Sequence, residues 1–179
     1  MKIRTVVGLT ALALLLATGA QLSAQQKAAE APAKEGVLTP KEISGKLMPE
    51  RVFFRGQVAS VQERNTGGVR YADGFFVFAG LVDSSGYSSG IREKYQAYFI
   101  TEVTLTIGGQ TLKPGAYGVG FLEGDKFIVM DLGANDLFTV GSTKDADLKH
   151  AMPLQVKAGD GGKYRLYKGK DYVEFQRAK

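Results

Sequence analysis

The stretch YQAYFITEVTLTI, residues 95–107, decides the fold class of this chain. Apolar residues occupy most of its alternate positions, while Gln, Glu and Thr hold most of the others. The apolar set consists of Tyr95, Ala97, Phe99, Val103, Leu105 and Ile107. Because successive side chains of a β-strand point to opposite faces, a period of two predicts one half-buried strand over this stretch.

The same period recurs from Arg51 onward and is interrupted by turn residues at short intervals. This pattern is typical of an all-β sandwich or barrel, and we expect one antiparallel domain of about eight or nine strands. The first strand is expected from about Val52 to Glu63 with a bulge at Gly56, followed by a turn over residues 65–68.

The end of the chain predicts a meander of three strands, over residues 154–158, 163–167 and 171–176. Earlier, Gly118 and Gly120 leave one face of a predicted strand without side chains. Such a face lets an aromatic ring, another backbone or a ligand approach closely, and a packed ring is the commonest occupant.

One short helix is expected before the strands. Thr39 can cap it, Pro40 suits its first position, and Glu42 lies three residues after the cap, as in a capping box. Pro49 limits its length, and the interpretation favoured by the sequence is that the helix covers an edge of the sheet.

The chain begins with the order of residues found in a secretory signal peptide. Lys2 and Arg4 precede an apolar run of about a dozen residues, followed by small residues. A membrane span needs about 20 apolar residues, so a cleavable leader over 1–24 is expected, with cleavage after Ala20 as the alternative. The sequence therefore predicts a leader (1–24), a flexible linker (25–38) and a β domain (39–179). The mature protein is expected in the periplasm or outside the cell, without a transmembrane segment.

Composition narrows the classes of function. The chain has no Cys, so neither a disulfide nor a lipid-anchoring thiol is available. Removing a leader with two basic residues from a chain with 23 basic and 18 acidic residues leaves 21 against 18, a net charge of +3. Charge this small does not favour a nucleic-acid partner.

The segment TLTIGGQTLKPGAYGVGFLEGDKFIVMDL, Thr104 to Leu132, resembles a family of uncharacterised secreted bacterial β-sandwich domains. The resemblance is carried by a strand, a short Gly turn and a Leu-x-Pro-Gly-x-Tyr step, in which Leu112, Pro114, Gly115 and Tyr117 stand. It implies secretion and an all-β fold, and it implies no activity.

Residues 86–90 match the G-x-S-x-G pattern of a hydrolase nucleophile, with Ser88 as the nucleophile and His150 as the base. The candidate acids are Asp131, Asp136 and Asp145. A nucleophile elbow joins a parallel strand to a helix, whereas this segment is a Ser/Gly run between antiparallel strands, so no catalytic residue is assigned.

No metal site or cofactor is expected either. His150 is the only histidine, and Asp136, Asp145 and Asp147 lack the dense register of a calcium loop.

The leading hypothesis is an exported, non-enzymatic domain that binds a small ligand or a partner in the cell envelope. Tyr95, Tyr117 and Phe121 are the candidate ligand-binding residues, because they lie on inward faces and Tyr combines an apolar ring with a polar tip. The alternative is a structural or assembly protein of the envelope, and a hydrolase using Ser88 comes third. The basic residues and tyrosines of the final meander also suit an anionic glycan or lipid headgroup, although charges on an exposed hairpin commonly serve solubility.

Overall fold

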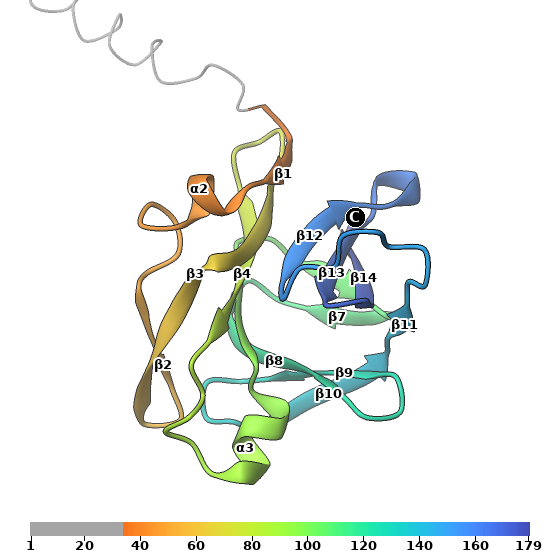
Figure 1. Cartoon of the computed structure of the whole chain (residues 1–179). Coiled ribbons are helices and arrows are strands. Elements are labelled where there is room, and N and C mark those ends of the chain that lie inside the picture. The colour runs from red at the N-terminus through yellow and green to blue at the C-terminus, as the bar shows by residue number, and fades with distance from the viewer. Residues whose placement is uncertain (1–33) are drawn as a thin grey trace, which may run out of the picture. The chain divides into compact units, whose positions relative to one another are not determined.

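The computed structural model describes residues 34–179, which form two packed antiparallel β-sheets and two short α-helices (Figure 1). The prediction of an all-β sandwich is confirmed. The described residues contain fourteen strands, more than expected, because several predicted strands are divided at turns or between the sheets. The leader over 1–24 and the linker as far as residue 33 lie outside the described residues.

The larger sheet has eight strands in the order β1-β3-β4-β5-β8-β9-β10, with β2 paired to β3. Its strands are β1 (Gly36–Leu38), β2 (Arg51–Phe54), β3 (Gln57–Arg70), β4 (Phe76–Val82), β5 (Ala97–Thr101), β8 (Gly115–Leu122), β9 (Lys126–Met130) and β10 (Asp136–Gly141).

The smaller sheet has six strands in the order β12-β13-β14-β6-β7, with β11 paired to β14. Its strands are β6 (Leu105–Ile107), β7 (Gln110–Leu112), β11 (Thr143–Lys144), β12 (Gln155–Ala158), β13 (Tyr164–Lys168) and β14 (Asp171–Arg177). The predicted C-terminal meander corresponds to β12, β13 and β14, which pair in sequence order.

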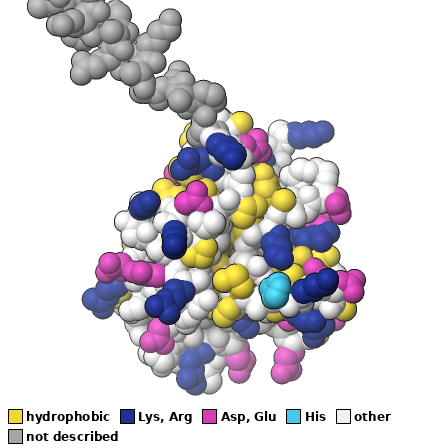
Figure 2. Space-filling model, turned by 45° about the horizontal axis from the view of Figure 1, so that its top comes forward, with side chains coloured by type: hydrophobic (Ala, Val, Ile, Leu, Met, Phe, Trp, Pro, Cys, Tyr) yellow, Lys and Arg dark blue, Asp and Glu magenta, His cyan; other side chains and the backbone are white. Residues whose placement is uncertain are grey.

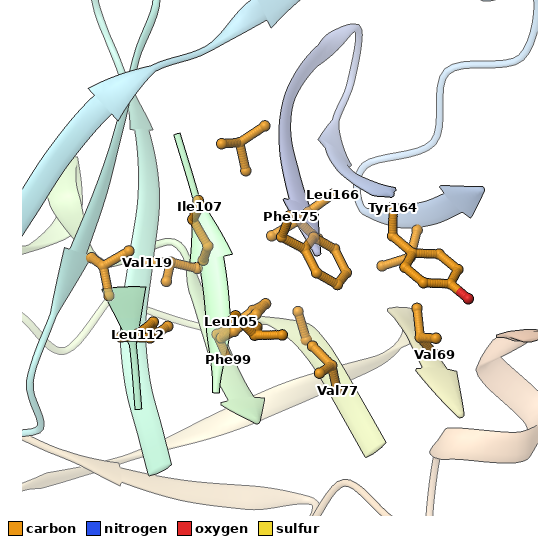
Figure 3. Close-up of a cluster of buried hydrophobic side chains, with 14 of the residues drawn as sticks. Val69, Val77, Phe99, Leu105, Ile107, Leu112, Val119, Tyr164, Leu166 and Phe175 are labelled. Atoms are coloured by element: carbon orange, nitrogen blue, oxygen red, sulfur yellow. The ribbon is translucent and has the colours of Figure 1, made fainter. Parts of the chain in front are cut away.

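The first core lies between the sheets and is built from the inward faces of both (Figure 3). Val77 and Phe99 of the larger sheet face Leu105 and Phe175 of the smaller one, and each is at most 2% exposed. Phe99 and Phe175 meet edge to face with ring centroids 6.2 Å apart. In a chain without disulfides, apolar burial of this kind is the main source of stability.

The stretch 95–107 forms two strands instead of one. β5 belongs to the larger sheet and β6 to the smaller, and the chain crosses between them at residues 102–104. Here the buried Thr101 hydroxyl donates a hydrogen bond to the Val103 carbonyl. The apolar alternation continues through the crossing because both strands face the same core, so sequence alone does not reveal the break.

A second core covers the other face of the larger sheet. Ile43, Phe54 and Tyr95 are fully buried there, together with Phe78 of β4. Val77 and Phe78 therefore point into different cores, which explains why β4 is apolar at consecutive positions.

The β2–β3 connection is a hairpin and not a bulge. Arg55 and Gly56 both have positive φ angles, 45° and 76°, as a two-residue type I′ turn requires. The prediction of a turn over residues 65–68 is wrong as well, because these residues lie within β3. Gly67 lets β12 approach, since a Cβ there would lie 2.7 Å from the Val156 nitrogen.

The predicted helix is present as α2 (Pro40–Ile43). Glu42 accepts hydrogen bonds from the backbone nitrogen and the hydroxyl of Thr39, at 2.8 and 2.7 Å. A second helix, α3 (Ser89–Lys94), is not expected from the sequence, because it begins within the Ser/Gly run over residues 84–90. Within residues 34–179, no helix is long and apolar enough to span a membrane.

The folded unit begins earlier than predicted. Gly36–Leu38, assigned from sequence to the linker, pair with β3 as β1, and Leu38 is buried in the second core. A short strand in a run without clear alternation gives little signal, so the domain boundary at Thr39 was set too late.

Candidate binding cleft at one end of the sandwich

The three residues predicted to bind a ligand do not share a cavity. Tyr95 is fully buried in the second core, where it stacks on Phe54 with ring centroids 3.8 Å apart. Tyr117 packs against the first core, and its hydroxyl donates a hydrogen bond to the Lys113 carbonyl at 2.8 Å. Burial raises the pKa of both tyrosines above the ordinary value.

Phe121 alone of the three lines a surface hollow, of about 530 Å³, at the C-terminal end of β8. Its ring meets Phe127 edge to face at 5.0 Å. Two polar groups beside it already have partners: the Gln96 amide bonds both backbone groups of Phe121, and Lys94 pairs with Asp136. The other polar side chains of the lining, Glu93, Glu123 and Lys126, are exposed to solvent, so this hollow contains no buried polar group in need of a partner.

The glycine face of β8 is occupied by the protein itself. A Cβ at Gly118 would lie 2.4 Å from the Phe54 ring, and one at Gly120 would lie 2.0 Å from the Lys94 carbonyl oxygen. The sequence singled out the correct face, and its commonest explanation, a packed ring, accounts for Gly118.

The space between the sheets is filled. A narrow apolar gap beside Ala97, Val119 and Leu166 holds about 10 Å³, at most about one water molecule. The hollows large enough for a ligand therefore lie on the outer surface of residues 34–179.

Ser88 acts as the N-cap residue of α3, where its carbonyl accepts hydrogen bonds from Ile91 and Arg92. Its neighbour Tyr87 is buried and donates its hydroxyl to the Phe54 carbonyl at 2.9 Å, which fixes the loop to the second core. Among the described residues, no hydrogen bond joins Ser88 to His150.

The three candidate acids of a triad have other partners. Asp131 caps the turn over residues 131–135, and hydrogen bonds from Asn135, then Gly133, lower its pKa. Asp136 pairs with Lys94, and Asp145 accepts the Tyr167 hydroxyl at 2.9 Å. Within residues 34–179, no group of three His, Asp or Glu side chains is arranged to hold a metal ion.

The basic meander forms a shallow groove of about 340 Å³ on the outer face of the smaller sheet. Glu174 there accepts hydrogen bonds from Arg165 at 3.0 Å and Lys163 at 3.2 Å. Burial opposes ionisation of Glu174, but these two bonds outweigh it and lower the pKa. Lys163, the cation of the groove lining, and the neighbouring Arg165 are both engaged with this carboxylate, and Arg165 also lies over the Tyr172 ring at 4.7 Å. The groove is therefore a weak site for an anion.

A more distinctive arrangement lies at the end of the sandwich where β1 begins and β14 ends (Figure 1). Two hollows, of about 440 and 400 Å³, meet there at Arg177 and Lys179. We call them together the end cleft. Its other lining residues come mainly from Glu35, from the β3–β4 turn, from the crossing between β5 and β6 and from the β12–β13 turn. They include Glu35, Tyr71, Asp73, Phe75, Glu102, Gly161, Gly162 and Gln176.

Tyr71 is the central residue of the end cleft. It is 6% exposed, and its ring meets Tyr164 edge to face at 6.1 Å. Its hydroxyl is buried, and among the described residues it has no hydrogen-bond partner. Burial, and secondarily Tyr164, raises the pKa of Tyr71 to about 12. A buried hydroxyl without a partner costs roughly 1–3 kcal/mol. The Tyr71 oxygen has less than 1 Å² of exposed area, so a group in the cleft would recover this free energy only after a small shift of the surrounding side chains.

Arg177 divides the two hollows. Its guanidinium lies 5.5 Å from the Tyr71 ring centroid and 6.0 Å from that of Phe75, and it pairs with Asp73. The hydrogen bond from Arg177 lowers the pKa of Asp73. The ion pair and the two rings hold the guanidinium between the hollows.

The remaining lining of the end cleft consists of polar side chains and of a glycine turn without side chains. The Tyr164 hydroxyl donates to Glu35 at 3.3 Å, and burial, then Glu35, raises the pKa of Tyr164. Gly161 and Gly162 form a turn with positive φ angles and open space where their side chains would be. Sequence reasoning missed this cleft, because the turn YADGF, residues 71–75, contains no motif and only folding brings it beside Arg177.

Comparison with known proteins gave no match: no family model, no curated protein and no solved structure matches the chain. The likeness of residues 104–132 to secreted β-sandwich domains thus remains a prediction.

Proposed function

We propose that this protein is an exported, non-enzymatic β-sandwich domain that binds a small ligand or an envelope partner at the end cleft. The observation that carries the proposal is the buried Tyr71 hydroxyl, which lacks a partner beside an open hollow of about 440 Å³. That volume lies within the range of about 300–1,000 Å³ usual for ligand pockets.

Export to the periplasm or the cell exterior is part of the proposal. It is supported by the order of charged, apolar and small residues over 1–24. A filled interior favours recognition on the surface over transport of a molecule inside the domain.

A structural or assembly role is the second candidate. Phe53 and Val58 are paired across the β2–β3 hairpin and are 54% and 53% exposed. Paired apolar side chains on an exposed sheet face suit contact with another copy or an envelope protein.

Native mass spectrometry of the protein purified from its own envelope fraction tests both. We expect a mature chain beginning at Gln25, or at Gln21 for the alternative cleavage, and carrying a bound mass that Phe75→Ala reduces and Phe53→Ala does not. A chain of unprocessed mass would exclude cleavage of the predicted leader. A ladder of multimers abolished by Phe53→Ala would favour assembly instead.

A further inference from the structure

The charge of the end cleft limits the ligands that it accepts. Its lining contains three carboxylates, of Glu35, Asp73 and Glu102, and two cations, of Arg177 and Lys179, a net charge of −1. An anionic ligand would meet this negative balance and compete with Asp73 for Arg177. Figure 2, in which this end of the molecule is turned forward, likewise shows both signs of charge interspersed with hydrophobic side chains. The cleft therefore favours a ligand without net negative charge.

The polar groups of the cleft include both donors and acceptors. Each carboxylate already accepts one hydrogen bond and keeps further lone pairs for a ligand: Asp73 accepts from Arg177, Glu35 from Tyr164 and Glu102 from the Phe76 backbone. Arg177 and Lys179 donate hydrogen bonds, and Gln176 and the Tyr71 hydroxyl do both. A ligand that satisfies such a mixture must itself carry many groups that donate and accept. Sugar hydroxyls have this property, since each has one proton and two lone pairs.

An exposed aromatic ring adds a second element of recognition. Phe75 is 47% exposed, and Arg177 lies against its ring. The face of an aromatic ring carries partial negative charge and attracts the weakly positive C–H groups of a pyranose ring. Hydroxyl-bonding groups in one hollow and an open ring in the next suit a ligand with several repeating units.

The bare turn leaves room for such a ligand. No atom lies within 4 Å of the Cβ positions of Gly161 and Gly162, at the rim of the hollow that contains Tyr71. A chain of sugar units can pass this rim without displacing a side chain.

We infer that the end cleft binds a neutral, hydroxyl-rich oligosaccharide, with its hydroxyls on Tyr71, Arg177 and the carboxylates, and with a sugar ring against Phe75. This inference rests on the proposed function, and it names the class of ligand for the same site.

The test is isothermal titration calorimetry of the purified protein with three neutral hexasaccharides: maltohexaose, cellohexaose and chitohexaose. We expect at least one to bind. Phe75→Ala should weaken it about tenfold, because losing one stacked ring removes about 1–1.5 kcal/mol. Tyr71→Phe, which keeps the ring and its packing, should weaken it about three- to tenfold through loss of one hydrogen bond.

Two matched variants control for general effects. Phe53→Ala removes a similarly exposed Phe from the β2–β3 hairpin, and Tyr95→Phe removes another buried hydroxyl without a partner, from the second core. Neither should change the affinity. Equal weakening by a cleft variant and its control would overturn the inference.

Other ligands distinguish an error in the ligand class from an error in the site. If only an oligogalacturonate bound, the ligand class would be an anionic sugar, and if only tetra-alanine bound, it would be a peptide. In either case the proposed function would stand, provided that Phe75→Ala weakened this binding. Absence of binding to all these probes would overturn the sugar assignment. The proposed function itself would fail if the bound mass of the envelope-purified protein were unaffected by both cleft variants.

Discussion

At the scale of single residues, the burial of Tyr71 has a consequence for the stability of the fold at alkaline pH. Its folded pKa of about 12 lies above the ordinary value of 10.0, chiefly because burial penalises the charged phenolate. The folded state therefore holds the proton more tightly than the unfolded state. The resulting stability is complete below pH 10 and is lost as pH rises toward 12.

We accordingly predict that Tyr71 contributes to alkaline unfolding. Tyr71→Phe should lose less stability between pH 10 and pH 12 than the parent chain does. Urea unfolding at several pH values measures this, and the difference in tyrosinate absorbance between the two proteins gives the pKa directly. A difference titration centred near pH 10 would show that the Tyr71 hydroxyl is hydrated, and would remove the main reason for placing a ligand there.

At the scale of single elements, the absence of a side chain at Gly118 of β8 lets β2 pack closely against this strand. Gly118 accommodates the Phe54 ring of β2, and Tyr95 lies on the same side with its nearest ring carbon 3.0 Å from a Cβ placed there. We predict that Gly118→Ala destabilises the fold by about 1–3 kcal/mol, the usual cost of overpacking.

Gly141→Ala provides the matched control for Gly118→Ala. Gly141 also lies in a strand of the larger sheet, as the last residue of β10, but no neighbouring atom lies within 4 Å of its Cβ position. Its free energy of unfolding should change by less than about 0.5 kcal/mol. Denaturant unfolding measures both variants, and similar values for the two would mean that the β2–β8 contact is loose enough to accept a methyl group.

The elements also show what sequence can predict. Alternation identified the buried residues from Ala97 to Ile107, and the capping residues identified α2. Alternation could not locate the crossing between sheets, because both sides of the crossing face one core. Turn chemistry was ambiguous for a related reason: Gly56 serves a positive φ angle in a hairpin, whereas Gly67 serves a close backbone contact within a strand. Only the three-dimensional contacts distinguish these two uses of glycine.

The candidate site depends even more on the tertiary structure. Tyr117 and Phe121 follow correctly from alternation as partly buried side chains that pack against the first core. Tyr95 is buried, but in the second core and not beside Ala97 and Phe99, because it precedes β5 and does not follow the period of that strand. The end cleft joins Glu35, the β3–β4 turn and the end of β14, which lie far apart in sequence. No local pattern records that these segments meet.

At the scale of the whole molecule, the position where the folded unit begins is an energetic question. The compact unit spans Lys34–Lys179, and β1 closes one edge of the larger sheet through three residue pairs with β3. Leu38 is 6% exposed and belongs to the second core. Removing β1 would expose this core and would leave the final residues of β3 with one neighbouring strand.

We therefore predict that a chain beginning at Thr39 is less stable than one beginning at Lys34 by at least about 2 kcal/mol, the lower range for loss of a buried Leu. Urea unfolding of the two chains measures the difference. In the longer chain, Leu38→Ala should reproduce much of the loss, because it removes the buried side chain and keeps the strand. If the two chains unfolded at the same urea concentration with the same slope, the domain would begin at Thr39, as the sequence predicts, and β1 would be an energetically neutral addition to the sheet edge.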